Sequence, residues 1–389
     1  MTAPLASAPA ASAPRASAPQ PRPGILDIVP YKPGKAGKPA PGRKLHKLSS
    51  NESGLGPSPA GMAAFADVAG ALEMYPDGAA GRLKAKIAEV HGLEEDRLYV
   101  GAGSDEIISN LCRAYAGEGR SIVQTRHGFS YYWLAAKAAG AEPLFAPETD
   151  LHADVDAILK TVREDTGVVF LANPNNPTGT LIPASEVRRL REELPDGVIL
   201  AIDGAYAEYM DPEGEYEDGV ALVRERIEGG QRDTLMMRTF SKIYGLGGLR
   251  VGWAYAPEEM IGVFDRIRSP FNVNAPALAA AEAALGDQDF VRRNRAHNEH
   301  ERARVRERAG ALGFESPTPS ANFVLLRMRG ETDDARAGEA ERLIAHLERD
   351  GIMVRSVAGA WLPGYVRVSV GSTEANDAFL ESLERFAAA

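Results

Sequence analysis

Short apolar runs alternate with amphipathic stretches along the chain from residue 51 onward. The runs cover residues 97–100, 121–124, 168–172, 198–202 and 234–237, and a helical pattern follows the second of them at 132–139. Their apolar residues do not strictly alternate with polar ones, which is typical of strands that are covered on both faces. We therefore expect an α/β domain built on a mainly parallel sheet with helices on both sides.

The pattern changes after Pro270. A long charged helix is expected over residues 289–309, followed by a strand at 321–326, another helix, strands at 352–355 and 366–370, and a final helix. Helices packed on one small sheet make a second domain, of the α+β type. We accordingly divide the chain into a leader (1–24), an N-terminal arm (25–50), a large domain (51–275) and a small C-terminal domain (276–389).

Composition narrows the class of protein. A chain of 389 residues, 44% hydrophobic and 25% charged, is long enough for two domains with large cores. The net charge of −10 argues against nucleic acid as a partner, and no apolar run reaches the roughly 20 residues that span a bilayer. The single cysteine, Cys112, is expected to be a buried filler, and it excludes an intramolecular disulfide. The Ala-, Ser- and Pro-rich leader is expected to be disordered and lacks the apolar core of a secretory signal, which favours the cytoplasm.

Polar residues follow four of the expected strands, at the point where each strand ends. They lie at residues 101–105, 173–179, 203 and 241–242. Ligands of parallel sheets bind beyond the carboxyl ends of the strands, so these residues are expected to meet at one site.

The residues around Lys242 suggest the chemistry of that site. An amine at Lys242, a hydroxyl at Ser241 and a guanidinium at Arg250 suit a phosphorylated aldehyde, which the amine would bond covalently while the other two hold the phosphate. Asp203 is a carboxylate that could pair with a pyridinium nitrogen. A lone Asp at a strand end is more often a turn residue, but here it occurs together with the Pro/Asn/Gly run 173–179, which would hold the Asn176 amide rigidly. Pyridoxal phosphate (PLP) chemistry is therefore the leading interpretation.

Other polar segments are less specific. The residues Gly103, Ser104 and Asp105 open a helix whose free N–H groups suit a phosphate, and the segment does not match the dinucleotide fingerprint. Most of the aromatic residues at 129–133 are expected in the core, with Phe129 the best candidate to stack on a planar ring. His297, Glu299 and His300 lack the spacing of a zinc helix and are expected on a solvated face, so no metal site is expected. Arg355 and Arg367 lie in expected strands, where either an anionic ligand or a structural salt bridge would satisfy them.

Taken together, these motifs resemble the fold-type I, class I/II aminotransferases, and within them the histidinol-phosphate aminotransferases. The resemblance spans residues 25–389 and rests on segments 30–34, 48–52, 75–77, 103–106, 173–179, 203–206, 241–250 and 362–371. It implies an α/β fold whose large domain has a mainly parallel, seven-stranded sheet, together with a small α+β domain. The sequence departs from the family pattern at Gly204 and Met74, neither of which is among the proposed contacts.

The resemblance also implies a role for each matching residue. Lys242 would bind PLP covalently and then act as general base, Asp203 would keep the ring nitrogen protonated, and Tyr206 and Asn176 would bind the ring hydroxyl. Phe129 would stack on the ring. The phosphate would be held by Ser241, Arg250 and the amides of Gly103, Ser104 and Asp105, and by Tyr75 of the second subunit of a homodimer. Tyr31, Arg355 and Arg367 would bind the substrate anions, and Asn51 and Asn322 would line the same pocket.

The function implied is a transaminase acting on histidinol phosphate and glutamate or 2-oxoglutarate in histidine biosynthesis. An aromatic amino acid transaminase of the same fold is the nearest alternative. A threonine-phosphate decarboxylase and a PLP-binding regulator without catalytic activity are more remote alternatives.

Overall fold

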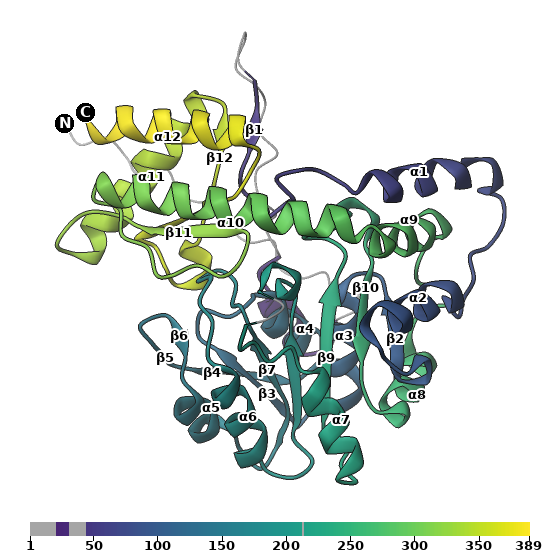
Figure 1. The fold of residues 1–389 in the computed structure, drawn as a ribbon. Helices are drawn as coiled ribbons and strands as arrows, with labels where there is room; N and C mark the ends of the chain where they lie inside the picture. The colour runs from purple at the N-terminus through teal and green to yellow at the C-terminus, as the bar shows by residue number, and fades with distance from the viewer. Residues whose placement is uncertain (1–20, 31–43, 212–213) are drawn as a thin grey trace, which may run out of the picture.

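The computed structural model describes residues 21–30, 44–211 and 214–389. Its central element is a seven-stranded sheet with the strand order β2-β10-β9-β8-β7-β3-β4 (Figure 1). The strands are β2 (Leu98–Gly101), β3 (Ser121–Thr125), β4 (Glu142–Ala146), β7 (Thr166–Ala172), β8 (Ile199–Asp203), β9 (Thr234–Thr239) and β10 (Gly252–Tyr255). Only β10 runs against its neighbours, so the expected mainly parallel, seven-stranded sheet is confirmed.

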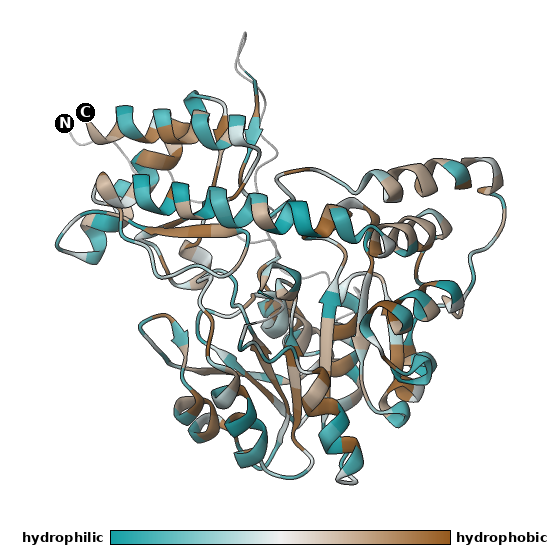
Figure 2. Cartoon of the chain, viewed as in Figure 1, coloured by the Kyte–Doolittle hydropathy of each residue, from teal (hydrophilic) through white to brown (hydrophobic). Residues whose placement is uncertain are grey.

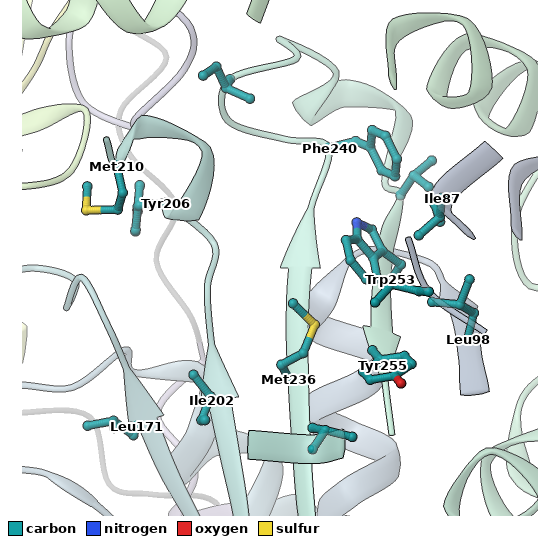
Figure 3. Packing of buried hydrophobic residues seen from close by; sticks show 14 of the residues in the cluster. Ile87, Leu98, Leu171, Ile202, Tyr206, Met210, Met236, Phe240, Trp253 and Tyr255 are labelled. Atoms are coloured by element: carbon teal, nitrogen blue, oxygen red, sulfur yellow. The ribbon is translucent and has the colours of Figure 1, made fainter. Parts of the chain in front are cut away.

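Both faces of this sheet are buried, as the absence of strict alternation predicts. Along β7, Val168 and Phe170 belong to one apolar cluster, while Val169 and Leu171 belong to another on the opposite face. The first cluster includes residues of α3 (Ser104–Tyr115), α4 (Tyr131–Ala139) and α8 (Glu258–Ile267). The second includes residues of α2 (Gly81–His91), α5 (Val155–Thr161), α6 (Ala184–Glu193), α7 (Val220–Glu228) and α9 (Ala275–Gly286), and part of it is drawn in Figure 3. Cys112 is fully buried in α3, as expected.

The C-terminal part forms a smaller layer on a three-stranded antiparallel sheet, β11-β14-β13. Its strands are β11 (Phe323–Arg327), β13 (Arg355–Ser356) and β14 (Tyr365–Ser369), with helices α11 (Asp333–Arg349) and α12 (Thr373–Ala387). The long helix α10 (Gln288–Ala311) extends from the large part to the small one (Figure 1). Val291 near its start belongs to a large-sheet cluster, and Val305 and Ala309 near its end belong to the small-sheet core. The helix therefore links the two cores.

Two segments pack outside the layers to which the sequence assigns them. The expected boundary at residue 276 falls inside α9, whose buried alanines join the core of the large sheet. In the N-terminal arm, β1 (His46–Lys47) pairs with β12 (Ile352–Met353), and Leu48 lies in the core of the small part. The leader residues 1–20 and the arm residues 31–43 lie outside the described part.

Short elements complete the structure. They are α1 (Pro59–Asp67), the hairpin of β5 (Glu148–Thr149) and β6 (His152–Ala153), and six 3-10 turns: η1 (Ile25–Asp27), η2 (Val68–Ala71), η3 (Glu95–Arg97), η4 (Ala207–Tyr209), η5 (Gly247–Leu249) and η6 (Ala358–Ala360). Hydrophobic residues concentrate in the strands of the large sheet, whereas helices such as α6, α7 and α10 show hydrophilic outer faces (Figure 2). Among the described residues, no helix combines the length and apolarity needed to cross a bilayer.

Candidate active site

A cavity of about 470 Å³ lies at the carboxyl edge of the large sheet, where strands of the small part face it. Twelve of the residues singled out in the sequence line it: Asn51, Ser104, Asp105, Phe129, Asn176, Asp203, Tyr206, Ser241, Lys242, Arg250, Arg355 and Arg367. The carboxyl ends of β7, β8 and β9 converge here because these strands are parallel neighbours. Lys242 and Asp203 therefore face one cavity.

Lys242 follows the end of β9, in a half-buried loop. The fully buried Phe240 anchors this loop in the core of the large sheet. Removal from water lowers the pKa of the Lys242 amine to about 8, and the nearby cations Arg367 and Arg250 act in the same direction. An amine with this pKa is partly deprotonated near neutral pH, as a nucleophile or general base requires.

Asp203 ends β8 and is almost completely buried. The hydroxyl of Tyr132 donates to its Oδ2 at 2.6 Å, and the backbone N–H of Ala205 donates to its Oδ1 at 3.0 Å. Burial raises the pKa of this carboxyl, while the two hydrogen bonds oppose the shift. A carboxylate in such a place is suited to a cationic partner.

Asn176 and Tyr206 both line the cavity. The Asn176 Oδ1 accepts a hydrogen bond from Arg367, which turns its Nδ2 donor the other way. Its loop is held by the neighbouring Asn175, whose side chain donates to Thr178 at 2.9 Å. The Tyr206 hydroxyl accepts from Asn51 at 2.8 Å.

The opposite end of the cavity is built for an anion. Ser104 and Asp105 open α3, where the first N–H groups of a helix have no intrahelical acceptor. Arg250 reaches both Ser241 Oγ, at 3.3 Å, and the Asp105 carboxylate, at 2.9 Å. Its backbone is left-handed, with a φ of 58°, an uncommon conformation that is concentrated at functional sites.

Gly103 contributes differently from the prediction. Its N–H already donates to the Gly101 carbonyl at 2.8 Å, so the expectation that this amide binds phosphate is wrong. Its φ is +80°, and a Cβ there would approach Arg250 Nη2 to 2.6 Å. The position therefore requires glycine for the close approach of the guanidinium.

Arg355 and Arg367 lie directly opposite each other on the paired strands β13 and β14. Arg367 also donates to the Ser49 carbonyl at 3.0 Å. Both arginines line the main cavity and also a second chamber of about 420 Å³, whose other wall includes Trp133, Val357 and Pro30. The two arginines therefore lie between two neighbouring cavities.

Asn322 does not line the cavity. It is buried behind the loop and donates to the carbonyls of Asn51 and Glu52, at 3.0 and 3.3 Å. The expectation that it lines the pocket is therefore wrong, because its amide is used to hold Asn51 in a left-handed conformation with a φ of 56°.

Of the two remaining tyrosines expected at the site, one does not line this cavity and the other lies outside the described residues, whereas a third tyrosine, not expected there, does line it. Tyr75 is 81% exposed, stacks on Phe271 and does not line the cavity of its own chain. Tyr31 lies outside the described residues. Tyr132, which the sequence places among packing aromatics, is the residue that reasoning from the sequence missed, because nothing in the local pattern shows that its hydroxyl reaches Asp203.

Among the described residues, no three His, Cys, Asp or Glu side chains gather as metal ligands do. His297 instead bonds the Gly371 carbonyl at 2.9 Å, and His300 is exposed. The groups that do gather fit PLP: an amine for its aldehyde, a buried carboxylate for its ring nitrogen, and a helix N-terminus with Ser241 and Arg250 for its phosphate.

Comparisons with known proteins agree with this geometry. The family profile "Aminotransferase class I and II" matches residues 43–383. The histidinol-phosphate aminotransferase of Rhodospirillum rubrum is 48% identical over 95% of this chain and 97% of its own length, and that of Maricaulis maris is 46% identical over 94% and 98%.

Among solved structures, the histidinol-phosphate aminotransferase of Sinorhizobium meliloti in complex with pyridoxal-5'-phosphate superposes with a TM-score of 0.85 at 27% identity, covering 96% of this chain and 99% of that one. The aspartate aminotransferase of Thermus thermophilus, at 21% identity and a TM-score of 0.75, shares the fold. The expected fold and family are confirmed: the chain belongs to the class I and II aminotransferases.

Proposed function

We propose that this protein is a PLP-dependent transaminase that transfers the amino group of L-histidinol phosphate to 2-oxoglutarate. The products are imidazole-acetol phosphate and L-glutamate, as in histidine biosynthesis. The names of the relatives support the substrate. The observation that carries the proposal is one cavity in which Lys242 and Asp203 face the arginine pair of β13 and β14.

PLP supplies a carbonyl carbon that bonds an amine and a ring that accepts electrons. Around it we assign the chain's own residues. Lys242 Nζ holds the cofactor and then accepts the proton from the substrate Cα, as its lowered pKa permits. Asp203 would keep the ring nitrogen protonated. Asn176 and Tyr206 would bind the ring hydroxyl, and Phe129 would cover a ring face.

The phosphate of the cofactor is assigned to Ser241, Arg250 and the N–H groups of Ser104 and Asp105. Arg355 and Arg367 are assigned to the substrate anions, which are the phosphate of histidinol phosphate in one half-reaction and the carboxylates of glutamate in the other. Asn51 orients Tyr206 through its hydrogen bond.

The second chamber favours an aromatic amino acid as the alternative substrate. Its walls include Trp133, Leu134 and Val357, which suit an aromatic side chain. Phenylalanine is therefore the competing substrate. The test compares kcat/KM for histidinol phosphate and phenylalanine with 2-oxoglutarate as acceptor, and measures CO2 release from threonine phosphate, because a decarboxylation needs no acceptor. Histidinol phosphate is expected to lead phenylalanine by about 100-fold, the value of one charge-assisted hydrogen bond to the phosphate. Absence of turnover with histidinol phosphate would remove the substrate assignment.

Arg355→Ala is expected to raise the KM for histidinol phosphate by about 10–100-fold, because a charge-assisted hydrogen bond to the phosphate is lost. The KM for L-histidinol, which carries neither phosphate nor carboxylate, is expected to change by less than about threefold. Steady-state kinetics with both substrates check this. An equal change for both would contradict a phosphate-binding role for Arg355.

We also propose a homodimer with composite sites. The segment from α1 to residue 75 exposes large apolar side chains, namely Met62, Phe65, Leu72, Met74 and Tyr75, and Phe271 lies beside Tyr75. Exposed apolar residues gathered in this way are typical of an interface. Because Tyr75 does not reach the cavity of its own chain, we assign it to the cofactor phosphate of the partner subunit.

Co-expression of two tagged variants tests this arrangement. Tyr75→Phe is expected to weaken PLP binding about 10-fold, the loss of one hydrogen bond to a charged group. A heterodimer pairs one Tyr75→Phe chain with one Lys242→Met chain. If Tyr75 acts across the interface, the site on the Tyr75→Phe chain has its own Lys242 and receives an unchanged Tyr75 from the Lys242→Met chain. At limiting PLP, roughly a quarter of all sites in a 1:1 mixture should then recover the parent affinity. If Tyr75 acts within its own chain, the heterodimer has no intact site and no recovery occurs.

The cytoplasm is the compartment we propose. Among the described residues, Cys112 is buried and unpaired, which suits reducing conditions. Cell fractionation with an antibody against the chain tests this location.

A further inference from the structure

The hydroxyl of Tyr132 is held in one position beneath the candidate cofactor site. Tyr132 lies on the sheet-facing side of α4 and is 1% exposed. Its ring stacks on Phe170 with a centroid distance of 4.6 Å and an interplanar angle of 5°, and Phe129 meets it edge-on at 5.6 Å. Fixed by these rings, the hydroxyl donates to Asp203 Oδ2 at 2.6 Å.

We propose that Tyr132 is a positioning residue that keeps Asp203 ionised and oriented toward the ring nitrogen of PLP. The inference deepens the proposed function, since it assigns the support of the group that pairs with the ring. It concerns cofactor binding, and therefore does not depend on which amino substrate the enzyme uses.

Electrostatics explain why Asp203 needs this support. Burial in a dry site raises the pKa of its carboxyl, and the nearby Asp105 carboxylate acts in the same direction. Opposing this are the hydrogen bonds from Tyr132 and Ala205 and the charge of Lys242. A protonated Asp203 would lose the negative charge that stabilises a pyridinium proton. Whether Asp203 stays ionised therefore depends on the hydrogen bonds and the Lys242 charge outweighing the effects of burial and Asp105.

In its bond to the Asp203 carboxylate, the Tyr132 hydroxyl is the donor. Burial and the adjacent Asp203 carboxylate raise the pKa of its hydroxyl well above its usual value, and Tyr206 and Asp105 add to the shift. The proton therefore stays on Tyr132 at every working pH. Because its hydroxyl meets Oδ2 while the Ala205 N–H meets Oδ1, the two donors together fix the plane of the carboxylate.

The variant Tyr132→Phe tests the proposal, because it removes the hydroxyl and keeps the stacked ring. Tyr131→Phe is the matched control, since the neighbouring hydroxyl bonds Ser109 Oγ at 2.9 Å and not Asp203. The dissociation constant of PLP is measured by equilibrium dialysis. Tyr132→Phe is expected to weaken PLP binding about 10–100-fold, the effect of one hydrogen bond to a buried charge, and Tyr131→Phe less than about twofold.

A second readout separates positioning from packing. The pH at which the visible absorbance of the PLP-loaded enzyme changes is expected to shift in Tyr132→Phe and to stay constant in Tyr131→Phe. In an Asp203→Asn background, Tyr132→Phe should cause no further loss of PLP affinity, because the carboxylate it supports is gone. The proposal would be overturned if folded Tyr132→Phe kept the PLP affinity and the absorbance profile of the parent. It would also be overturned if Tyr132→Phe weakened PLP binding in the Asp203→Asn background as much as it does in the parent.

Discussion

Replacing Lys242 with Met is expected to lower kcat for amino transfer at least about 10⁴-fold, the upper end of what a general base contributes, and more because covalent catalysis is lost too. Methionine keeps the volume of the stem in the loop after β9 and removes only the amine. The visible band at about 410–430 nm that a lysine–pyridoxal bond produces should also disappear. Stopped assays with enzyme saturated in PLP, together with absorbance spectra, check both effects.

The control is Lys160→Met, which changes an exposed lysine at the end of α5. It should leave both kcat and the spectrum unchanged. Residual transfer by Lys242→Met within about 100-fold of the parent would mean that another group takes the proton from the substrate Cα.

In the absence of PLP, Lys242→Met is also expected to be more stable than the parent at neutral pH. Because the pKa of Lys242 falls to about 8 in the folded chain and is 10.5 in the unfolded one, the unfolded state binds more protons between these values. The destabilisation is thus complete below pH 8 and disappears as the pH rises to 10.5. Without cofactor, the free energy of unfolding of Lys242→Met should therefore be higher than that of the parent by roughly 1–2 kcal/mol at pH 7. The figure allows for screening by water, because the side chain is only half-buried. Urea unfolding at pH 7 and above pH 10 checks that the difference shrinks.

Asp203→Asn is expected to have the second largest effect. The Tyr132 hydroxyl and the Ala205 N–H both donate to the carboxylate, and an amide can offer an acceptor to only one of them. The variant also loses the charge that holds the ring nitrogen protonated. Loss of a buried charge partner costs about 3–5 kcal/mol, which corresponds to a fall in kcat of roughly 10²–10³-fold or more.

Transient kinetics of the first half-reaction measure this loss at the chemical step. Asp218→Asn serves as a control, because that carboxylate pairs with Arg238 outside the cavity. If Asp203→Asn retains the parent rate of proton removal, the pairing of Asp203 with the ring nitrogen is not what drives the reaction.

Some structural features escaped the sequence pattern for identifiable reasons. Strand β4 contains Glu142 and Pro143 and lies at the sheet edge, where such residues are tolerated, so no apolar run marks it. Strand β10 is only four residues long and begins with glycine. Both acquire their conformation from the neighbour to which they bond, β3 for β4 and β9 for β10.

The roles of individual amides and hydroxyls also escaped it. The residues around Gly103 suggested three free N–H groups, but the Gly103 amide closes its own turn. Asn322 was expected in the pocket, but its amide holds the loop of Asn51. In both cases a group that could have bound a ligand instead donates its hydrogen bond to a backbone carbonyl of the protein.

The sequence by itself determined the fold class, the cofactor chemistry and most of the site. Burial on both faces is encoded in the composition of each strand, and parallel neighbours bring their carboxyl ends to one edge, so Asp203 and Lys242 could be placed together before any coordinates. Only the tertiary structure decided that Tyr132 supports Asp203 and that Arg355 faces Arg367. Those contacts join residues from different elements, and their geometry depends on how helices and strands pack, which no local pattern records.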